Sequence, residues 1–178
     1  MKHLAGKVLI VSGVFTLLVA FQHKARAGGE DDDRSSTEQS RIQVGFRIAP
    51  VPLDLGHKNP ELVGLGSYIA NAVGGCNDCH TNPSYLPGGN PFHYLAGGQA
   101  FGPFISRNLT PENGLPAGRT YAEFKNIMRT GIDYDHAHPQ INPLLQVMPW
   151  PTYQEMTEHE LRAIYEYLSA IPPATPSP

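Results

Sequence analysis

Residues 76–80 read Cys-Asn-Asp-Cys-His, and these side-chain types at this spacing can hold a metal cofactor. In one helical turn, Cys76 lies three residues before Cys79 and four before His80, so all three side chains can face one side. This sequence is the attachment signature of a c-type haem. The thiols can form thioethers with the haem vinyl groups, and the imidazole can bind the iron as proximal ligand. The motif therefore predicts one covalently attached haem c, with His80 on its iron.

Three other uses of the cysteine pair remain open from the residues alone. An exported protein could join Cys76 and Cys79 in a disulfide. A thioredoxin-like redox pair needs a strand–helix setting, whereas here a predicted helix precedes the motif and loops follow it. A zinc site needs four ligands, commonly two cysteine pairs or a cysteine pair with a spaced histidine pair. His136 and His138 are too close together for that spacing.

A second iron ligand is expected if the protein only carries electrons. A thioether sulfur is the usual soft ligand, and it raises the reduction potential. Met128 lies on an apolar helix face and Met156 precedes the helix N-cap Thr157, so both have a structural role. Met148 lies in the stretch 143–151, where three prolines exclude a helix, and we predict that its sulfur binds the iron. The alternatives are five histidines, of which the first two are favoured because they lie in a loop: His136, His138, His57, His93 and His159.

Two further side chains are candidate haem contacts. Trp150, the only tryptophan, could donate its indole N–H to a haem propionate, or it could simply pack in the core. Arg107 could pair with a propionate carboxylate, because its guanidinium suits carboxylates. A solvated arginine is an equally good interpretation, so we prefer Trp150 of the two.

The helix that leads into the motif is predicted from its capping pattern. Asn59 is a good N-cap, and Pro60 and Glu61 suit the first turn. Two glycines at 74–75 weaken or end this helix just before Cys76. Spacings of three and four place four apolar residues on one face: Leu62, Leu65, Ile69 and Val73.

Two more helices are predicted downstream. One begins with a capping box at Thr120 and Glu123 and ends at Gly131. The other begins with a capping box at Thr157 and Glu160 and ends at the two prolines that follow Ile171. Between the motif and these helices, the residues are rich in Gly, Pro and Asn, which favours long functional loops with one capped turn near 110–114.

Composition agrees with a loop-rich helical fold. The 178 residues include 18 glycines and 17 prolines, so much of the backbone should be loop and a large sheet is disfavoured. We therefore predict an all-α fold with about three main helices and long loops around one haem.

The N-terminal 27 residues are predicted to be a secretory signal. A basic start is followed by a largely apolar run over 8–21 and by the small-x-small sequence Ala-Arg-Ala at 25–27. An uncleaved membrane anchor is the alternative, although the run is short for a spanning helix. Export would agree with haem c attachment, which takes place outside the cytoplasm.

The remaining chain is divided by its patterns into three segments. Residues 28–58 are predicted to be extended or mobile, with a strand or extended segment at 42–48 where apolar residues alternate. Residues 59–172 form the predicted haem domain, and residues 173–178 form a loose tail.

Charge excludes one class of partner. Removal of residues 1–27 would take away four of the 13 basic residues and none of the 16 acidic ones, leaving a net charge of −7. Such a chain is repelled by nucleic acid. A redox partner with a basic patch is expected instead, and a membrane is expected only as a neighbour or through an uncleaved anchor.

Over roughly residues 60–171 the chain resembles the class I c-type cytochromes, small all-helical haem proteins. The helix before the motif looks like that family's N-terminal helix, and residues 161–168 look like the C-terminal helix that crosses it. Met-Pro-Trp-Pro at 148–151 looks like the methionine-ligand loop. Asn-Leu-Thr-Pro at 108–111 is similar to the cytochrome modules of periplasmic dehydrogenases. The resemblance implies a cytochrome c-like fold with His80 and Met148 as axial ligands.

The motif and the resemblance together predict an exported, periplasmic or otherwise extracytoplasmic, single-haem electron carrier. It would not be an enzyme, and its redox partners would be a dehydrogenase or an oxidase. Two alternatives remain: a haem subunit of a multi-subunit dehydrogenase, and a haem enzyme or sensor with an open sixth iron position.

Overall fold

The structure, a computed structural model, describes residues 36–83, 91–133 and 142–177. It divides into two units, residues 1–40 and residues 41–178. The predicted signal lies outside the described residues. Within the described ranges, no helix combines the length and the apolar character that a membrane crossing requires.

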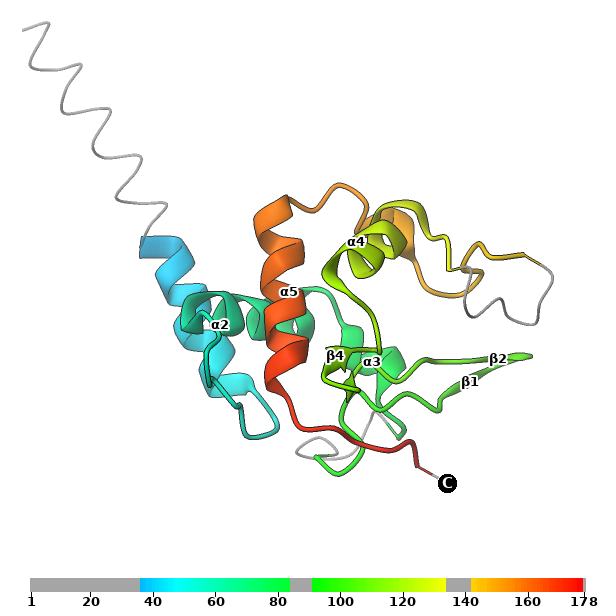
Figure 1. The fold of residues 1–178 in the computed structure, drawn as a ribbon, viewed down its shortest axis with the longest axis horizontal. Coiled ribbons are helices and arrows are strands. Elements are labelled where there is room, and N and C mark those ends of the chain that lie inside the picture. The colour runs from blue at the N-terminus through cyan, green and yellow to red at the C-terminus, as the bar shows by residue number, and fades with distance from the viewer. Residues whose placement is uncertain (1–35, 84–90, 134–141, 178) are drawn as a thin grey trace, which may run out of the picture. The chain divides into compact units, whose positions relative to one another are not determined.

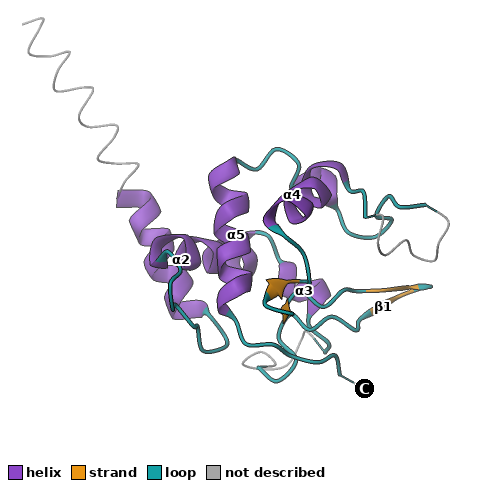
Figure 2. Ribbon diagram, in the orientation of Figure 1, coloured by secondary structure: helices purple, strands orange, loops and turns teal. Residues whose placement is uncertain are grey.

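Helices dominate the described residues (Figure 1, Figure 2). The helical elements are a helix over 36–48, α2 (Pro60–Tyr68), a π-helical turn (Ile69–Val73), α3 (Cys76–His80), α4 (Tyr121–Thr130), a 3₁₀ turn (Trp150–Thr152) and α5 (Glu158–Ala170). Two antiparallel hairpins pair β1 (Ala100–Phe101) with β2 (Phe104–Ile105), and β3 (Pro111–Glu112) with β4 (Leu115–Pro116). The mainly helical prediction is confirmed, whereas the all-α description holds only in part because of these hairpins.

Residues 42–48 are helical, so the prediction of a strand or extended segment there is wrong. Ile42 and Gly45, three residues apart, are buried, whereas Phe46 is 38% exposed. Gly45 packs directly on α2: an ideal Cβ on it would lie 1.8 Å from the carbonyl oxygen of Gly64. Ser67 Oγ also donates to the Gly45 carbonyl (2.7 Å). The contacts of Gly45 with α2 therefore explain why residues 42–48 form a helix.

α2 and α5 cross in close contact and form the centre of the core (Figure 1). α2 begins as predicted, since Asn59 Oδ1 accepts a hydrogen bond from the Glu61 amide (2.9 Å). At the crossing, an ideal Cβ on Gly66 would lie only 1.9 Å from the Ala163 carbonyl oxygen. The absence of a side chain at residue 66 therefore sets how closely the two helices approach.

The predicted apolar face of the first helix is interrupted by the π-helical turn. The Gly74 amide donates to the Ile69 carbonyl (2.6 Å), a bond over five residues rather than four. The wider turn rotates the chain, so Leu65 and Ile69 are buried but Val73 is 65% exposed. The side chain of Asn71 in this turn is hydrogen-bonded to two tyrosine hydroxyls, those of Tyr94 and Tyr167.

α4 and α5 begin and end as predicted. Both predicted capping boxes are present, with Thr120 and Thr157 as the N-caps. Gly131 caps α4 in the left-handed region, with φ 68°, which favours glycine. Local side-chain chemistry therefore determines where both helices start and stop.

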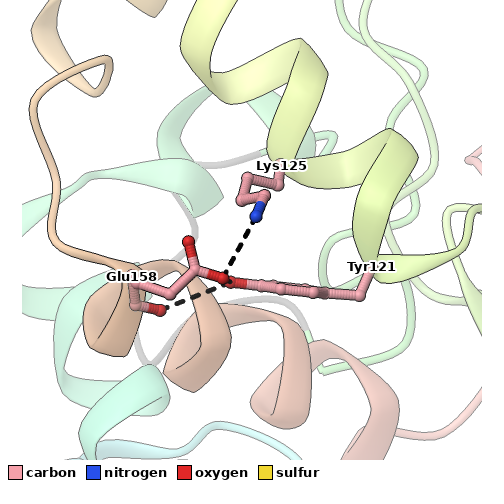
Figure 3. Close-up of polar contacts among 3 residues, drawn as sticks. All are labelled: Tyr121, Lys125 and Glu158. Atoms are coloured by element: carbon pink, nitrogen blue, oxygen red, sulfur yellow. Dashed lines mark hydrogen bonds and ion pairs between the residues drawn. The ribbon is translucent and has the colours of Figure 1, made fainter.

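The N-terminal ends of α4 and α5 are joined by a polar cluster (Figure 3). Tyr121 donates its hydroxyl to Glu158 Oε1 (2.7 Å), and Lys125 Nζ lies 3.3 Å from the same oxygen. Arg162 on α5 lies over the Tyr121 ring, 3.4 Å from its centroid. These contacts hold α4 against α5 at the protein surface.

Two loop predictions need correction. Residues 110–114 contain the turn of the β3–β4 hairpin rather than a capped helical turn, because Asn113 (φ 51°) and Gly114 (φ 81°) both have positive φ. The tail, predicted to be loose, is hydrogen-bonded as far as Thr175: Asn108 donates to the Ala174 carbonyl (2.8 Å), and a His93 ring nitrogen lies 2.8 Å from the Thr175 carbonyl.

Candidate haem-binding site

A cavity of about 310 Å³ lies beside α3 and is lined mainly by apolar side chains. Its volume is within the range of small-molecule sites in proteins. The π turn, α3, the β1–β2 hairpin, α4, residues 142–149 and α5 all contribute to its wall. Five of the six predicted site residues line it: Cys76, Cys79, His80, Arg107 and Met148. The fold therefore brings residues of the motif to the same space as residues about 30 and 70 positions later.

α3 presents the two cysteines to this cavity. Gly75 precedes the helix with φ 59°, so the chain turns sharply between the π turn and α3. Both thiols are free. Burial raises the pKa of Cys76 to about 11 and also raises that of Cys79, with the Asp78 carboxylate adding to both shifts. Free thiols one helical turn apart on a cavity wall fit the donor set that covalent haem attachment requires.

His80 is oriented by a backbone hydrogen bond. Its Nδ1 lies 2.7 Å from the Arg107 carbonyl oxygen. Because a carbonyl only accepts, Nδ1 carries the proton and Nε2 keeps its lone pair, as in histidines that bind metals. Burial lowers the pKa of His80, which favours the neutral imidazole. The histidine is therefore in the state that an iron ligand needs.

Three methionines line the cavity: Met128, Met148 and Met156. Met128 is 6% exposed on α4, and Met156 packs against the hydrophobic core. Met148 lies in a non-helical segment, as predicted. It is followed by an inverse γ-turn, in which Pro149 has φ −78° and ψ 55° and the Trp150 amide donates to the Met148 carbonyl (2.8 Å). Ligation by Met148 remains a prediction that this placement allows.

None of the alternative histidine ligands that the structure describes lines the cavity. His57, His93 and His159 do not line the cavity, and His136 and His138 lie outside the described residues. Across the described ranges, no group of three or more His, Cys, Asp or Glu side chains is placed to hold a metal ion.

Trp150 is absent from the cavity wall. Its indole packs on Gly131 at the end of α4, where an added Cβ would lie 2.4 Å from Trp150 Nε1. The structure thus gives the ring a packing contact. Its hydrogen bond to a propionate remains a prediction.

A buried ion pair of Arg119 and Asp133, for which the sequence carries no local signal, lies in the cavity wall beside the predicted site residue Arg107. Arg119 Nη2 lies 2.7 Å from Asp133 Oδ1, and the two side chains are 11% and 7% exposed. Arg107 lines the same wall, and burial lowers its pKa while the Asp133 carboxylate acts in the opposite direction. The wall thus contains two guanidinium groups, of Arg107 and Arg119, and two carboxylates, of Glu112 and Asp133. Guanidinium groups are the side chains best suited to pair with anionic groups of a ligand.

Comparison with curated proteins identifies relatives of one kind. The chain is 34% identical over 139 residues to the cytochrome c subunit of alcohol dehydrogenase (quinone) from Gluconacetobacter polyoxogenes, covering 72% of this chain and 27% of that protein. This chain is a relative of dehydrogenase cytochrome c subunits. It is also 32% identical over 114 residues to the gluconate 2-dehydrogenase cytochrome c subunit of Pantoea cypripedii, a match that covers 61% of this chain and 23% of that protein. The chain is likewise 32% identical over 123 residues to the fructose dehydrogenase cytochrome subunit of Gluconobacter japonicus, a match that covers 65% of this chain and 23% of that protein.

The expected resemblance to dehydrogenase cytochrome modules is thereby confirmed. The chain spans about a quarter of the length of these cytochrome subunits. No family model matches the chain, and no solved structure matches it significantly.

Proposed function

We propose that this relative of dehydrogenase cytochrome subunits is an electron-transfer protein whose cavity beside α3 binds one haem c. When bound, the haem iron would carry one electron by alternating between its ferric and ferrous states. The observation that carries the proposal is the placement of Cys76, Cys79 and His80 on one turn of helix at the wall of one cavity. The hydrogen bond from His80 Nδ1 to the Arg107 carbonyl adds to it, because it frees Nε2 for the iron.

Different residues of the cavity would bind different parts of the haem. The Cys76 and Cys79 thiols would form the covalent bonds, His80 Nε2 and the Met148 sulfur would bind the iron, and the apolar wall would exclude water. A thioether ligand and limited solvent access both raise a reduction potential. The Arg107 and Arg119 guanidinium groups would face the propionate carboxylates.

A cytochrome c-like fold is part of the proposal. The helix that leads into the cysteine motif crosses the C-terminal helix α5, which is the crossing expected from the resemblance. The proposed haem domain covers residues 59–172. Residues 41–48 pack against it, so we extend its supporting structure to them.

A dehydrogenase is the proposed electron donor. By their names, the relatives are cytochrome subunits of dehydrogenases of alcohol, gluconate and fructose. We propose that this chain likewise accepts electrons from a dehydrogenase of an alcohol or sugar substrate, and does no substrate chemistry itself. Export through the signal at 1–27 would place it outside the cytoplasm. A haem enzyme or sensor with an open iron position is not favoured by these relatives.

Covalent haem provides the test. The full chain is produced in a bacterial host that attaches haem c, and the protein is resolved on a denaturing gel and stained for haem. The wild type should retain haem through denaturation, whereas Cys76→Ala and Cys79→Ala should each retain much less. Colourless wild-type protein, or unchanged staining of both variants, would overturn the proposal.

A further inference from the structure

The segment that carries Met148 is a continuous series of hydrogen-bonded turns. After the inverse γ-turn at Pro149, the Tyr153 amide donates to the Trp150 carbonyl (2.9 Å), and the Thr152 amide donates to the Pro149 carbonyl (2.9 Å). Because each turn is closed by its own hydrogen bond, a displacement of Tyr153 is transmitted along the backbone to Met148. Residues 148–153 therefore behave as one short rigid unit.

This unit is tied to the C-terminal end of α4. The Leu145 amide, just before the unit, donates to the Gly131 carbonyl (2.8 Å), and the Trp150 ring packs on the same glycine. The Arg129 guanidinium donates to the Gln154 carbonyl on the other side of the unit. All of these contacts hold the unit to α4, and none of them fixes its position relative to the cysteine turn.

Tyr153 connects this unit to the residues before the cysteine turn. Its hydroxyl donates to the Gly74 carbonyl (2.8 Å), a partly buried bond between residues 79 positions apart. Gly74 lies against the first cysteine, since an ideal Cβ on Gly74 would be 3.6 Å from Cys76 Sγ. Tyr153 and Gly74 both line the cavity. The side chain of Tyr153 thus connects the Met148 segment to the residues immediately before the haem-attachment turn.

We propose that Tyr153 is a positioning residue that holds the Met148 segment at a fixed distance from the cysteine turn and so keeps the Met148 sulfur on the iron. The inference rests on the proposed haem binding and on Met148 as sixth ligand. Without the hydroxyl, the Met148 segment stays attached to α4 but can move relative to Gly74. An external ligand then competes more successfully for the iron.

The test measures how readily imidazole displaces the sixth ligand in the ferric holoprotein. Imidazole is titrated into the wild type and Tyr153→Phe, and the loss of the sulfur-to-iron charge-transfer band gives its dissociation constant. Tyr165→Phe is the matched control, because Tyr165 also donates a partly buried hydroxyl to a main-chain carbonyl, that of Arg119 (2.9 Å). The same comparison is made in a Met148→Ala background, where imidazole binding is followed by the shift of the haem absorption bands.

Tyr153→Phe should bind imidazole about fivefold to tenfold more tightly than the wild type, the effect that loss of one neutral hydrogen bond supports. Tyr165→Phe should stay within about twofold even if its stability to urea falls equally. In the Met148→Ala background, Tyr153→Phe should have no effect. Unchanged imidazole affinity of Tyr153→Phe, or an equal change in Tyr165→Phe, would overturn the positioning role while leaving haem binding intact. A wild type that retains haem but lacks the sulfur band would overturn methionine ligation and this inference together.

Discussion

Replacement of Gly66 by alanine should destabilise the protein, although alanine is the better helix former. In an exposed helix interior, this exchange would stabilise by about 1 kcal/mol. Here the added Cβ would lie 1.9 Å from the Ala163 carbonyl oxygen and 2.7 Å from the Cβ of Tyr167, whereas real Cβ atoms essentially never come closer than 3.0 Å. α2 and α5 must therefore separate by about 1.1 Å where they cross.

The expected size of the effect follows from what the crossing buries. Val63, Leu161 and Tyr167 are each fully buried in this core. Insertion of an extra methyl group into such packing costs about 1–3 kcal/mol, and occasionally more. The clash is with a backbone carbonyl rather than with a flexible side chain, so the upper end of this range, about 3 kcal/mol, applies. Less the gain of about 1 kcal/mol in helix propensity, the free energy of unfolding should fall by about 2 kcal/mol.

Urea unfolding of the holoprotein, followed by far-ultraviolet circular dichroism, measures this change. The midpoint should fall while the slope stays constant, because the surface exposed on unfolding is nearly the same. Ala122→Gly on the exposed side of α4 calibrates helix propensity in this protein, with an expected loss of about 1 kcal/mol. A Gly66→Ala protein that is as stable as the wild type, or more stable, would refute a close crossing of α2 and α5.

Two further predictions concern the iron and the buried tyrosines. Met148→Ala should lower the reduction potential and allow the reduced protein to bind carbon monoxide; an unaltered optical spectrum in both oxidation states would show that another side chain is the ligand. The pKa of Tyr94 lies well above its ordinary value of about 10. Burial is the main cause, and the neighbouring Tyr167 adds to it. Because the folded state then holds a proton that the unfolded state loses, the contribution of Tyr94 to stability should be constant below about pH 10 and should fall as the pH rises above it. Urea midpoints measured between about pH 9 and pH 11 test this, and Tyr94→Phe should make the fall shallower; a fall as steep in the variant would exclude Tyr94 as its source.

The features that the sequence predicts correctly have a local physical mechanism. Thr120 and Thr157 cap their helices through side-chain bonds to residues three positions later, and Gly131 ends α4 because it can adopt a positive φ. The Cys-x-x-Cys-His motif is likewise confined to one helical turn. Such signals are contained in a few consecutive residues, so they can be recognised without knowledge of the fold.

The features that were missed depend on contacts between distant segments. Gly45 interrupts an apolar alternation in the sequence, yet in the structure it is a contact point on α2, and this contact favours the helix. The ion pair of Arg119 and Asp133 forms across the length of α4, with one partner before and one after that helix. The Asn113-Gly114 pair, by contrast, is a local hairpin signal, because both residues readily adopt the positive φ that this turn needs.

The packing of Trp150 on Gly131 gives the protein a built-in optical reporter. It is the only tryptophan in the chain, so all indole emission comes from one place, the short turn between Met148 and Tyr153. If haem binds in the cavity as proposed, it should absorb the energy of the excited indole, and tryptophan fluorescence should therefore be weaker in the protein with haem than in the protein without it. The recovery of this fluorescence during unfolding would then record when the turn that carries Trp150 separates from the haem, independently of the loss of helix elsewhere.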